Sequence, residues 1–329
     1  MIEVVSMEEI KTIGILTSGG DAPGMNATIR AVVRSAIFNG FAVKGIRHGY
    51  NGLLTDDIFD MNLRSVSEII HRGGTMLFTA RSDEFKTAEG QKKAVETCNR
   101  YGIDALIVIG GDGSFRGCQA LAKQGIKCIG IPCTIDNDIA CSDYTIGFDT
   151  ALNTAMEMID KLRDTTQSHE RCSVVEVMGR HAGYIAVNTG IATGALCILI
   201  PEVPVDIDRD VIARIKETQK EGKKNFLIVV AEGVGKALDI AEEVQKKTGL
   251  DTRATVLGHV QRGGSPSLRD RVVAAQMGVH AVELLQLKNY NRVVALRGEK
   301  ITDYSIDEAL AMKKELDPML IGVAKVVSI

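Results

Sequence analysis

The chain has 329 residues, of which 45% are hydrophobic and 25% charged, and its formal net charge at pH 7 is -3. This is the composition of a folded globular protein, and the charge gives no support to binding of nucleic acid or of an anionic membrane surface. No apolar run reaches transmembrane length, and residues 1–9 lack the apolar stretch of a signal peptide. The length favours two domains over one.

The seven cysteines form no C-x-x-C pair and have no zinc-binding spacing. Several lie in predicted strands, where we expect them to be small buried residues of a protein kept in a reducing compartment. We therefore expect a cytoplasmic location.

The first predicted strand, residues 12–17 (TIGILT), leads into a glycine-rich turn at 18–24 (SGGDAPG). A helix is predicted from about Met25. Its expected core positions are Ile29, Val32, Val33 and Ala36. A strand, a glycine-rich turn and a helix start together form an anion cradle, because backbone N–H groups can approach phosphate oxygens there.

A second strand at 104–109 runs into residues 110–114 (GGDGS), and a helix with Cys118, Leu121 and Ala122 as candidate core positions follows. Asp112 would repel a phosphate on its own, but it fits if Mg²⁺ bridges carboxylate and phosphate. The turn is neither a Walker A loop nor a G-x-G-x-x-G fingerprint. A plain glycine-rich turn is the alternative.

A third strand at 126–131 precedes residues 132–138 (PCTIDND). Thr134, Asp136 and Asp138 can hold a divalent cation, accept a proton from a hydroxyl, or both. An Asx turn or helix cap is the alternative explanation. Because ligands bind beyond the carboxyl ends of parallel strands, we expect all three loops to serve one crevice.

Further strands are predicted at 173–177, 196–200, 226–230 and 293–296. Alternation of strands and helices along the whole chain indicates an α/β fold with right-handed connections.

Together with residues 178–180 (MGR) and 258–264 (GHVQRGG), these loops resemble the bacterial ATP-dependent 6-phosphofructokinases over nearly the whole chain. The resemblance implies two Rossmann-like three-layer α/β domains with chain crossovers between them. The larger, ATP-binding domain would comprise residues 1–146 and 260–310. The smaller, sugar-phosphate-binding domain would comprise residues 147–259 and 311–329.

The reaction that the resemblance implies is Mg²⁺-dependent transfer of the ATP γ-phosphoryl group to the C1 hydroxyl of fructose 6-phosphate. Asp136 would be the general base, Asp112 would hold Mg²⁺, and Asp138 would support metal and sugar. The implied catalytic set is Asp136, Arg180, Thr134 and Gly20, with Thr134 donating to the transferring group and Arg180 stabilising charge.

Arginine suits the sugar phosphate because its planar fork binds phosphate in two places at once. The implied sugar-phosphate contacts are Thr134, Ile135, Asp136, Asp138, Arg171, Met178, Gly179, Arg180, Glu232, Arg253, His259 and Arg262. In the family, arginines matching Arg171 and Arg253 come from a neighbouring subunit. This implies a homotetramer with active sites shared across subunits.

The implied nucleotide contacts are Gly20, Tyr50, Arg81, Ser82, Gly111, Asp112, Gly113 and Ser114. Ser82 stands where an aromatic residue is common. Gly113 favours ATP, because pyrophosphate-dependent relatives carry Asp in its place. Cys133 is neither the Gly of ATP enzymes nor the Lys of pyrophosphate enzymes, so its effect on donor choice stays open.

An effector pocket for ADP or phosphoenolpyruvate is implied at Arg30, Arg34, Arg163 and Lys223. Arg30 and Arg34 alone would be read as a solvated basic stripe, since they lie on one helix face. Leu63 replaces a common arginine, and Leu196 replaces a glutamate that helps to hold Mg²⁺. We therefore expect weak or altered activation by ADP.

Two alternatives remain: a pyrophosphate-dependent phosphofructokinase, and a non-catalytic regulatory subunit of the same fold. The presence of Asp112, Asp136, Asp138 and Arg180 argues against the second. A dinucleotide oxidoreductase is excluded because the fingerprint glycines and the ribose-binding acidic residue are missing.

Overall fold

The computed structural model describes residues 10–328, which form an α/β protein built on two separate sheets of seven and four strands. The chain divides into two compact units. Unit 1 contains the residues up to Thr134 together with Ile139–Gly147 and Ser265–Lys313. Unit 2 contains Ile135–Asp138, Phe148–Gly264 and the chain from Lys314 onward. The predicted α/β class is confirmed. Residues 1–9, which are acidic and have no assigned role, lie outside the described residues.

The sheet of unit 1 has the strand order β11-β10-β5-β4-β1-β2-β3. Its strands are β1 (Thr12–Thr17), β2 (Ala42–Ile46), β3 (Ile58–Met61), β4 (Ala105–Gly110), β5 (Lys127–Pro132), β10 (Arg292–Arg297) and β11 (Lys300–Ser305). The edge strands β3 and β11 are antiparallel to their neighbours, and the others run parallel. The strand order reverses between β1 and β4. Ligands of open α/β sheets bind at such a reversal, so the loops after β1 and β4 are the natural place for a site.

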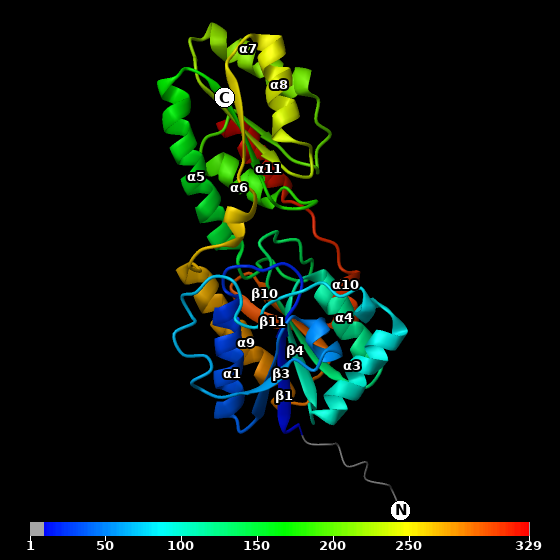
Figure 1. Ribbon diagram of the computed structural model, residues 1–329. Coiled ribbons are helices and arrows are strands. Elements are labelled where there is room, and N and C mark those ends of the chain that lie inside the picture. Colours follow the sequence, from blue (N-terminus) through cyan, green and yellow to red (C-terminus); the bar gives the residue numbers. More distant parts are fainter. Residues whose placement is uncertain (1–9, 329) are drawn as a thin grey trace, which may run out of the picture. The chain divides into compact units, whose positions relative to one another are not determined.

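Helices cover both faces of the unit 1 sheet (Figure 1). On one face lie α1 (Met25–Phe38) and α9 (Leu268–Gln286); on the other lie α3 (Ala88–Arg100), α4 (Asp112–Ala122) and α10 (Ile306–Ala311). Shorter elements are α2 (Tyr50–Leu54) and the 3-10 helix Glu84–Lys86. The four core positions predicted for α1 are all fully buried. In α4, Cys118 and Leu121 are buried, but Ala122 is only half-buried because the helix ends there, so that prediction is wrong.

Unit 2 is built on an all-parallel sheet with the order β7-β8-β6-β9. The strands are β6 (Cys172–Val177), β7 (Cys197–Leu199), β8 (Phe226–Ala231) and β9 (Thr252–Val256). Strand β8 is apolar and buried at every position, as expected of a strand covered on both faces.

The helices of unit 2 also form two layers (Figure 1). On one face α7 (Ala213–Lys220) and α8 (Ala237–Thr248) complete an apolar core with the strands. The other helices are α5 (Phe148–Ser168), α6 (Tyr184–Ala192) and α11 (Pro318–Val327), of which α6 packs against both others. A π-helical turn, Asp208–Ile212, and the 3-10 helix Gly258–Arg262 complete the unit.

All seven cysteines are buried thiols, which confirms the prediction made for those in strands. Among residues 10–328, no helix combines the length and the apolar character needed to cross a bilayer.

Candidate functional site

In unit 1, the loops that follow β1 and β4 are joined by hydrogen bonds. Ser18 N–H donates to the Ile109 carbonyl over 2.9 Å, and the Ser114 hydroxyl donates to the Ser18 carbonyl over 3.0 Å. A Cβ atom on Gly110 would lie 2.4 Å from both Ser114 Oγ and the Ser18 carbonyl oxygen, so only glycine fits. The structure thus brings the first two predicted loops together at the reversal of strand order.

The second loop ends at the start of α4, where Gly111 precedes the helix and Asp112 is its first residue. The first turn of a helix has N–H groups without partners in the helix, and its dipole attracts anions. A Cβ atom on Gly113 would have no atom within 4 Å, so open space lies beside this backbone. The arrangement can receive a phosphate chain with the backbone close to it.

Tyr50 supports this helix start from inside the protein. It is 5% exposed, its hydroxyl donates to the Ser114 carbonyl over 2.5 Å, and its ring stacks on Phe85 with centroids 4.1 Å apart. Burial, with a smaller contribution from Cys118, raises the pKa of Tyr50 well above its usual value. The phenol is therefore neutral and acts as a hydrogen-bond donor.

The other predicted nucleotide residues of unit 1 lie in exposed loops. Arg81 is exposed, and Ser82 Oγ accepts a hydrogen bond from the Phe85 N–H group over 3.2 Å. The turn that contains Gly20 is held by Thr79, whose hydroxyl donates to the Gly19 carbonyl over 2.7 Å. This hydrogen bond fixes the position of the turn.

Cys133 begins the third loop, and its N–H group donates to the Gly110 carbonyl over 3.0 Å. Its side chain is 1% exposed. Burial raises the pKa of this thiol well above its usual value, and the negative charges of Asp270 and Asp21 raise it further. Position 133 therefore has a small, uncharged side chain that cannot replace a lysine.

Among residues 10–328, no three or more His, Cys, Asp and Glu side chains gather in a way that could hold a metal ion. Mg²⁺ commonly binds one or two carboxylates and takes its remaining ligands from substrate phosphates and water. Asp112, half-exposed in the first turn of α4, fits that mode of binding.

In unit 2, the turn after β6 carries Arg180 in a constrained backbone. A Cβ atom on Gly179 would lie 2.4 Å from the Ala182 carbonyl oxygen, and Arg180 itself has φ 59°. Glu232, directly after β8, accepts hydrogen bonds at Oε1 from the N–H groups of Gly179 (3.2 Å) and Arg180 (2.6 Å). Glu232, predicted to contact sugar hydroxyls, thus also holds the Arg180 turn.

The third loop passes from unit 1 to unit 2 after Thr134, whose carbonyl accepts a hydrogen bond from the Thr145 hydroxyl over 2.7 Å. Ile135 is buried, and Asp136 is 7% exposed. The pKa of Asp136 is raised to about 6, chiefly by burial and also by the negative charges of Asp138 and Glu232, against the opposing effect of Arg262 and Arg180. A carboxylate with a pKa near 6 is mostly ionised at pH 7 and is a stronger base than an ordinary aspartate.

Two arginines, Arg180 and Arg262, lie near the carboxylates of Asp136 and Asp138. Arg180 Nη1 is 4.0 Å from Asp138 Oδ2. Arg262 is the last residue of the 3-10 helix Gly258–Arg262. This helix contacts the residue after β6, because Gln261 Oε1 accepts a hydrogen bond from the Met178 N–H group over 3.3 Å. His259, on the same helix, is exposed.

Arg171 and Arg253 lie at the opposite end of the unit 2 sheet. Arg171 precedes β6, and Arg253 pairs in register with Ser173. Ser173 is the second residue of β6, whereas Arg180 lies beyond its last residue, Val177. The strand from Ser173 to Val177 alone spans ~13 Å. Arg253 forms an ion pair with Asp251 at 3.0 Å. Within one chain, these two arginines are therefore not brought together with Arg180 and Arg262.

The predicted effector residues are divided between the units. In unit 1, Arg30, Arg34 and Leu63 line one groove beside α1. In unit 2, Arg163 Nε and Nη2 are buried without a hydrogen-bond partner among the described residues. Leu196 is 2% exposed within the apolar core of unit 2, and Lys223 lies at the turn before β8.

A comparison with protein families matches residues 12–285 to the phosphofructokinase family model. The chain belongs to the phosphofructokinase family. It is 58% identical to the ATP-dependent 6-phosphofructokinase of Clostridioides difficile and 56% identical to that of Bacillus mycoides. Each alignment covers 97% of this chain and the whole of the relative.

Among solved structures, the chain is similar to the phosphofructokinase of Saccharomyces cerevisiae, with a TM-score of 0.86 and 35% identity. The match covers 97% of this chain and 48% of the yeast chain, so this chain spans about half of that protein. The predictions of the family and of the fold are confirmed.

Sequence reasoning missed one side chain that holds the segment after the third loop, residues 139–147, and one that holds the third loop itself. In unit 1, Asp270 is fully buried and accepts hydrogen bonds from the Tyr144 hydroxyl (2.5 Å) and the Gly147 N–H group (2.7 Å). The Ser267-x-x-Asp270 capping pattern at the start of α9 could have drawn attention to it. In unit 2, Lys314 donates to the Asn137 carbonyl over 2.7 Å, and no sequence pattern marks it.

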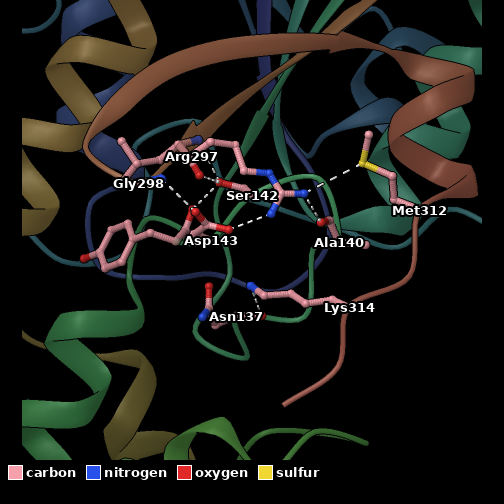
Figure 2. A network of polar contacts seen from close by, with 10 residues as sticks. Asn137, Ala140, Ser142, Asp143, Arg297, Gly298, Met312 and Lys314 are labelled. Atoms are coloured by element: carbon pink, nitrogen blue, oxygen red, sulfur yellow. Dashed lines mark hydrogen bonds and ion pairs between the residues drawn. The ribbon is translucent and has the colours of Figure 1, made fainter. Parts of the chain in front are cut away.

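The same segment of unit 1 is held by Arg297 (Figure 2). This side chain pairs with Asp143 at 2.6 Å and donates to the Ala140 carbonyl over 2.9 Å. Asp143 also accepts a hydrogen bond from the Gly298 N–H group over 2.8 Å. Residues 139–147 thus return to the unit 1 sheet along a fixed path.

Proposed function

We propose that this chain transfers the γ-phosphoryl group of ATP to the C1 hydroxyl of fructose 6-phosphate, with the residues described above in the roles given below. The activity itself follows from homology: at 56–58% identity over 97% of its length, the chain is an ATP-dependent 6-phosphofructokinase, a kinase of glycolysis. The observation that carries the mechanism is the buried Asp136, whose pKa of about 6 suits a general base. A glycolytic role would place the protein in the cytoplasm.

In this proposal, unit 1 binds the nucleotide. The predicted nucleotide set from Gly20 to Ser114 would surround the phosphate chain, with backbone N–H groups at the start of α4 facing its oxygens. The open space beside Gly113 supports ATP over pyrophosphate, since it leaves room for an α-phosphate. The uncharged Cys133 supports the same choice, because no cation stands there.

Mg²⁺ bound through Asp112 would neutralise charge on the β- and γ-phosphates when the nucleotide is present. Asp138 would support metal and sugar. Arg81, exposed in its loop, would lie beside the transferring group.

Asp136 would accept the proton of the C1 hydroxyl as this oxygen attacks the γ-phosphorus. Thr134 and Arg180 would stabilise the charge that develops on the transferred group, and Gly20 would approach it through its backbone. Glu232 supports this step by holding the Arg180 turn through two backbone hydrogen bonds.

In unit 2, His259 and Arg262 would bind the 6-phosphate together with Arg171 and Arg253 of another copy of the chain. This division is supported by the separation of the two pairs along the unit 2 sheet. It is the basis for proposing a homotetramer with shared active sites.

Regulation would act through Arg30, Arg34, Arg163 and Lys223, with ADP and phosphoenolpyruvate as effectors. The buried Arg163 nitrogens without partners support anion binding. The burial of Leu196 in the unit 2 core supports weak activation by ADP, because no carboxylate stands there to hold a nucleotide-bound metal. Strong activation by ADP at subsaturating fructose 6-phosphate, abolished by Arg30→Ala, would contradict this.

The test of the proposed function is fructose 1,6-bisphosphate formation from fructose 6-phosphate and Mg²⁺, run in parallel with ATP and with pyrophosphate. We expect product with ATP alone, lost in Asp136→Ser. Product with pyrophosphate instead would favour the pyrophosphate-dependent alternative, and no product with either donor would favour a regulatory subunit.

A further inference from the structure

The peptide between the two carboxylates of the third loop has an unusual conformation. Asn137, between Asp136 and Asp138, has φ 52°, in the left-handed region that glycine adopts freely, asparagine adopts at times and most other residues avoid. The side chain of Lys314 donates a hydrogen bond to the Asn137 carbonyl over 2.7 Å (Figure 2). A charged donor on the carbonyl favours one orientation of this peptide.

Lys314 is itself held in place by unit 2. Its ammonium lies 5.0 Å from the centroid of the Tyr184 ring, which begins α6. A cation over an aromatic face is attracted by the electron-rich ring. Lys314 is also the first residue of the C-terminal segment of unit 2, whereas the adjacent Lys313 belongs to unit 1 and is exposed.

The segment that Lys314 contacts is very short. Only four residues, Ile135–Asp138, belong to unit 2 at this point, and the chain on either side belongs to unit 1. Arg180 also approaches the segment, at 4.0 Å from Asp138, and this pair is longer and more exposed than the Lys314 contact. The hydrogen bond from Lys314 is therefore the shorter of these two links between the segment and the rest of unit 2.

We propose that Lys314 is a positioning residue for phosphoryl transfer: it holds the Asn137 peptide in its left-handed conformation and thereby aims Asp136 and Asp138. The inference rests on the proposed role of Asp136. Rotation of this peptide would turn both neighbouring carboxylates, so the base would lose its position relative to Arg180 and Glu232. Fructose 6-phosphate would still be held by Arg262 and His259, and the loss would fall on kcat more than on KM.

The experiment compares Lys314→Met, which keeps the length of the stem without the charge, with Lys314→Arg and with Lys313→Met as the matched control. We expect Lys314→Met to lower kcat roughly tenfold, the usual consequence of losing a charged hydrogen bond, with the KM for fructose 6-phosphate changed less than about threefold. Lys314→Arg should recover much of the loss, and Lys313→Met should match the unchanged chain.

A second substitution separates positioning from a general loss of structure. Glycine adopts positive φ without strain, so Asn137→Gly should restore part of the kcat lost in Lys314→Met. Glycine at this position can also restore stability, so kcat is measured well below the melting temperature of each variant, where a general loss of structure would not lower it.

The inference is overturned if Lys314→Met keeps kcat within about twofold of Lys313→Met, or if neither Lys314→Arg nor Asn137→Gly recovers activity. The role of Lys314 is judged from the kcat of each variant divided by the kcat of the unchanged chain. Failure of the unchanged chain to form fructose 1,6-bisphosphate would instead contradict the proposed function.

Discussion

The predicted site residues of unit 1 differ in kind from those of unit 2. Unit 1 offers backbone and small side chains: Gly110 where no Cβ fits, Gly113 beside open space, and Ser114 tied to the neighbouring loop. Unit 2 offers charged side chains at strand ends, where Asp136 and Arg180 lie in one electrostatic group. From this difference we expect that substitutions in unit 1 impair activity when they add atoms or charge, whereas substitutions in unit 2 impair activity when they remove a charged group.

The largest effect is expected from removing the base of unit 2. Asp136→Asn keeps the size of the side chain but cannot accept the proton, so kcat should fall about 10²–10⁴-fold. Binding of ATP and of fructose 6-phosphate, measured by titration calorimetry, should stay close to that of the unchanged chain. A kcat within tenfold of the unchanged chain would mean that another group is the base.

In unit 1, adding a charge should impair the reaction, as removing a charge should in unit 2. Gly113→Asp has room for its side chain, but the carboxylate would face the phosphate chain and should raise the KM for ATP about 10- to 100-fold, as expected of like charges a few ångströms apart. Gly113→Ala is the matched control, because its Cβ enters open space and removes only glycine's flexibility. Equal KM values for the two variants would show that the space beside Gly113 is not used by the nucleotide.

Removing a cation from unit 2 should weaken binding of the sugar phosphate. Arg262→Ala should raise the KM for fructose 6-phosphate about 10- to 100-fold, since a hydrogen bond to a charged group is worth about 1.5–3 kcal/mol. Arg262 also lowers the pKa of Asp136, so the same variant should move the acid limb of the activity profile to higher pH. An unchanged KM in steady-state assays would remove Arg262 from the phosphate clamp.

The pH dependence should report the buried base. Asp136 must be ionised to accept a proton, so kcat/KM for fructose 6-phosphate should fall as pH decreases through about 6. Because the charge of Asp138 helps to raise this pKa, Asp138→Asn should move the midpoint to lower pH whatever its effect on the rate. A midpoint near 4 in the unchanged chain would contradict the burial of Asp136.

The raised pKa of Asp136 also has a consequence for stability. The pKa of Asp136 is raised on folding from 3.8 to about 6, so the contribution of this group to stability is fully present below pH 3.8 and is lost as pH rises through 6. The rise corresponds to about 3 kcal/mol. Asp136→Asn should therefore melt at a higher temperature than the unchanged chain at pH 8 but not at pH 4. Melting temperatures that differ equally at both pH values would rule out ionisation as the cause.

Much of the fold could be predicted because parallel strands buried on both faces are continuous apolar runs. All seven predicted strands occur, with ends that differ by one residue at most. The missed strands β3, β9 and β11 carry exposed or half-exposed polar residues, so no continuous run marks them. Strand β2 is interrupted by Lys44 and Gly45.

Residue types and their place after a strand are enough to propose roles for Asp112 and Asp136, and these roles stay predictions. The candidate site could not be predicted where a side chain acts through contacts distant in sequence. Lys314 reaches the carbonyl of Asn137 across 177 positions, and Asp270 reaches Tyr144 across 126. The return of the chain to unit 2 at Lys314 depends on tertiary packing, which no local pattern encodes.

The most direct test of the division between the units is a crossed measurement of Michaelis constants. The KM for ATP would be measured in Arg262→Ala, and the KM for fructose 6-phosphate in Gly113→Asp, each at saturating concentrations of the other substrate. The account predicts that both values stay within about twofold of the unchanged chain, since each substitution touches only its own substrate. A rise of either value comparable to that of the variant's own substrate would contradict the division.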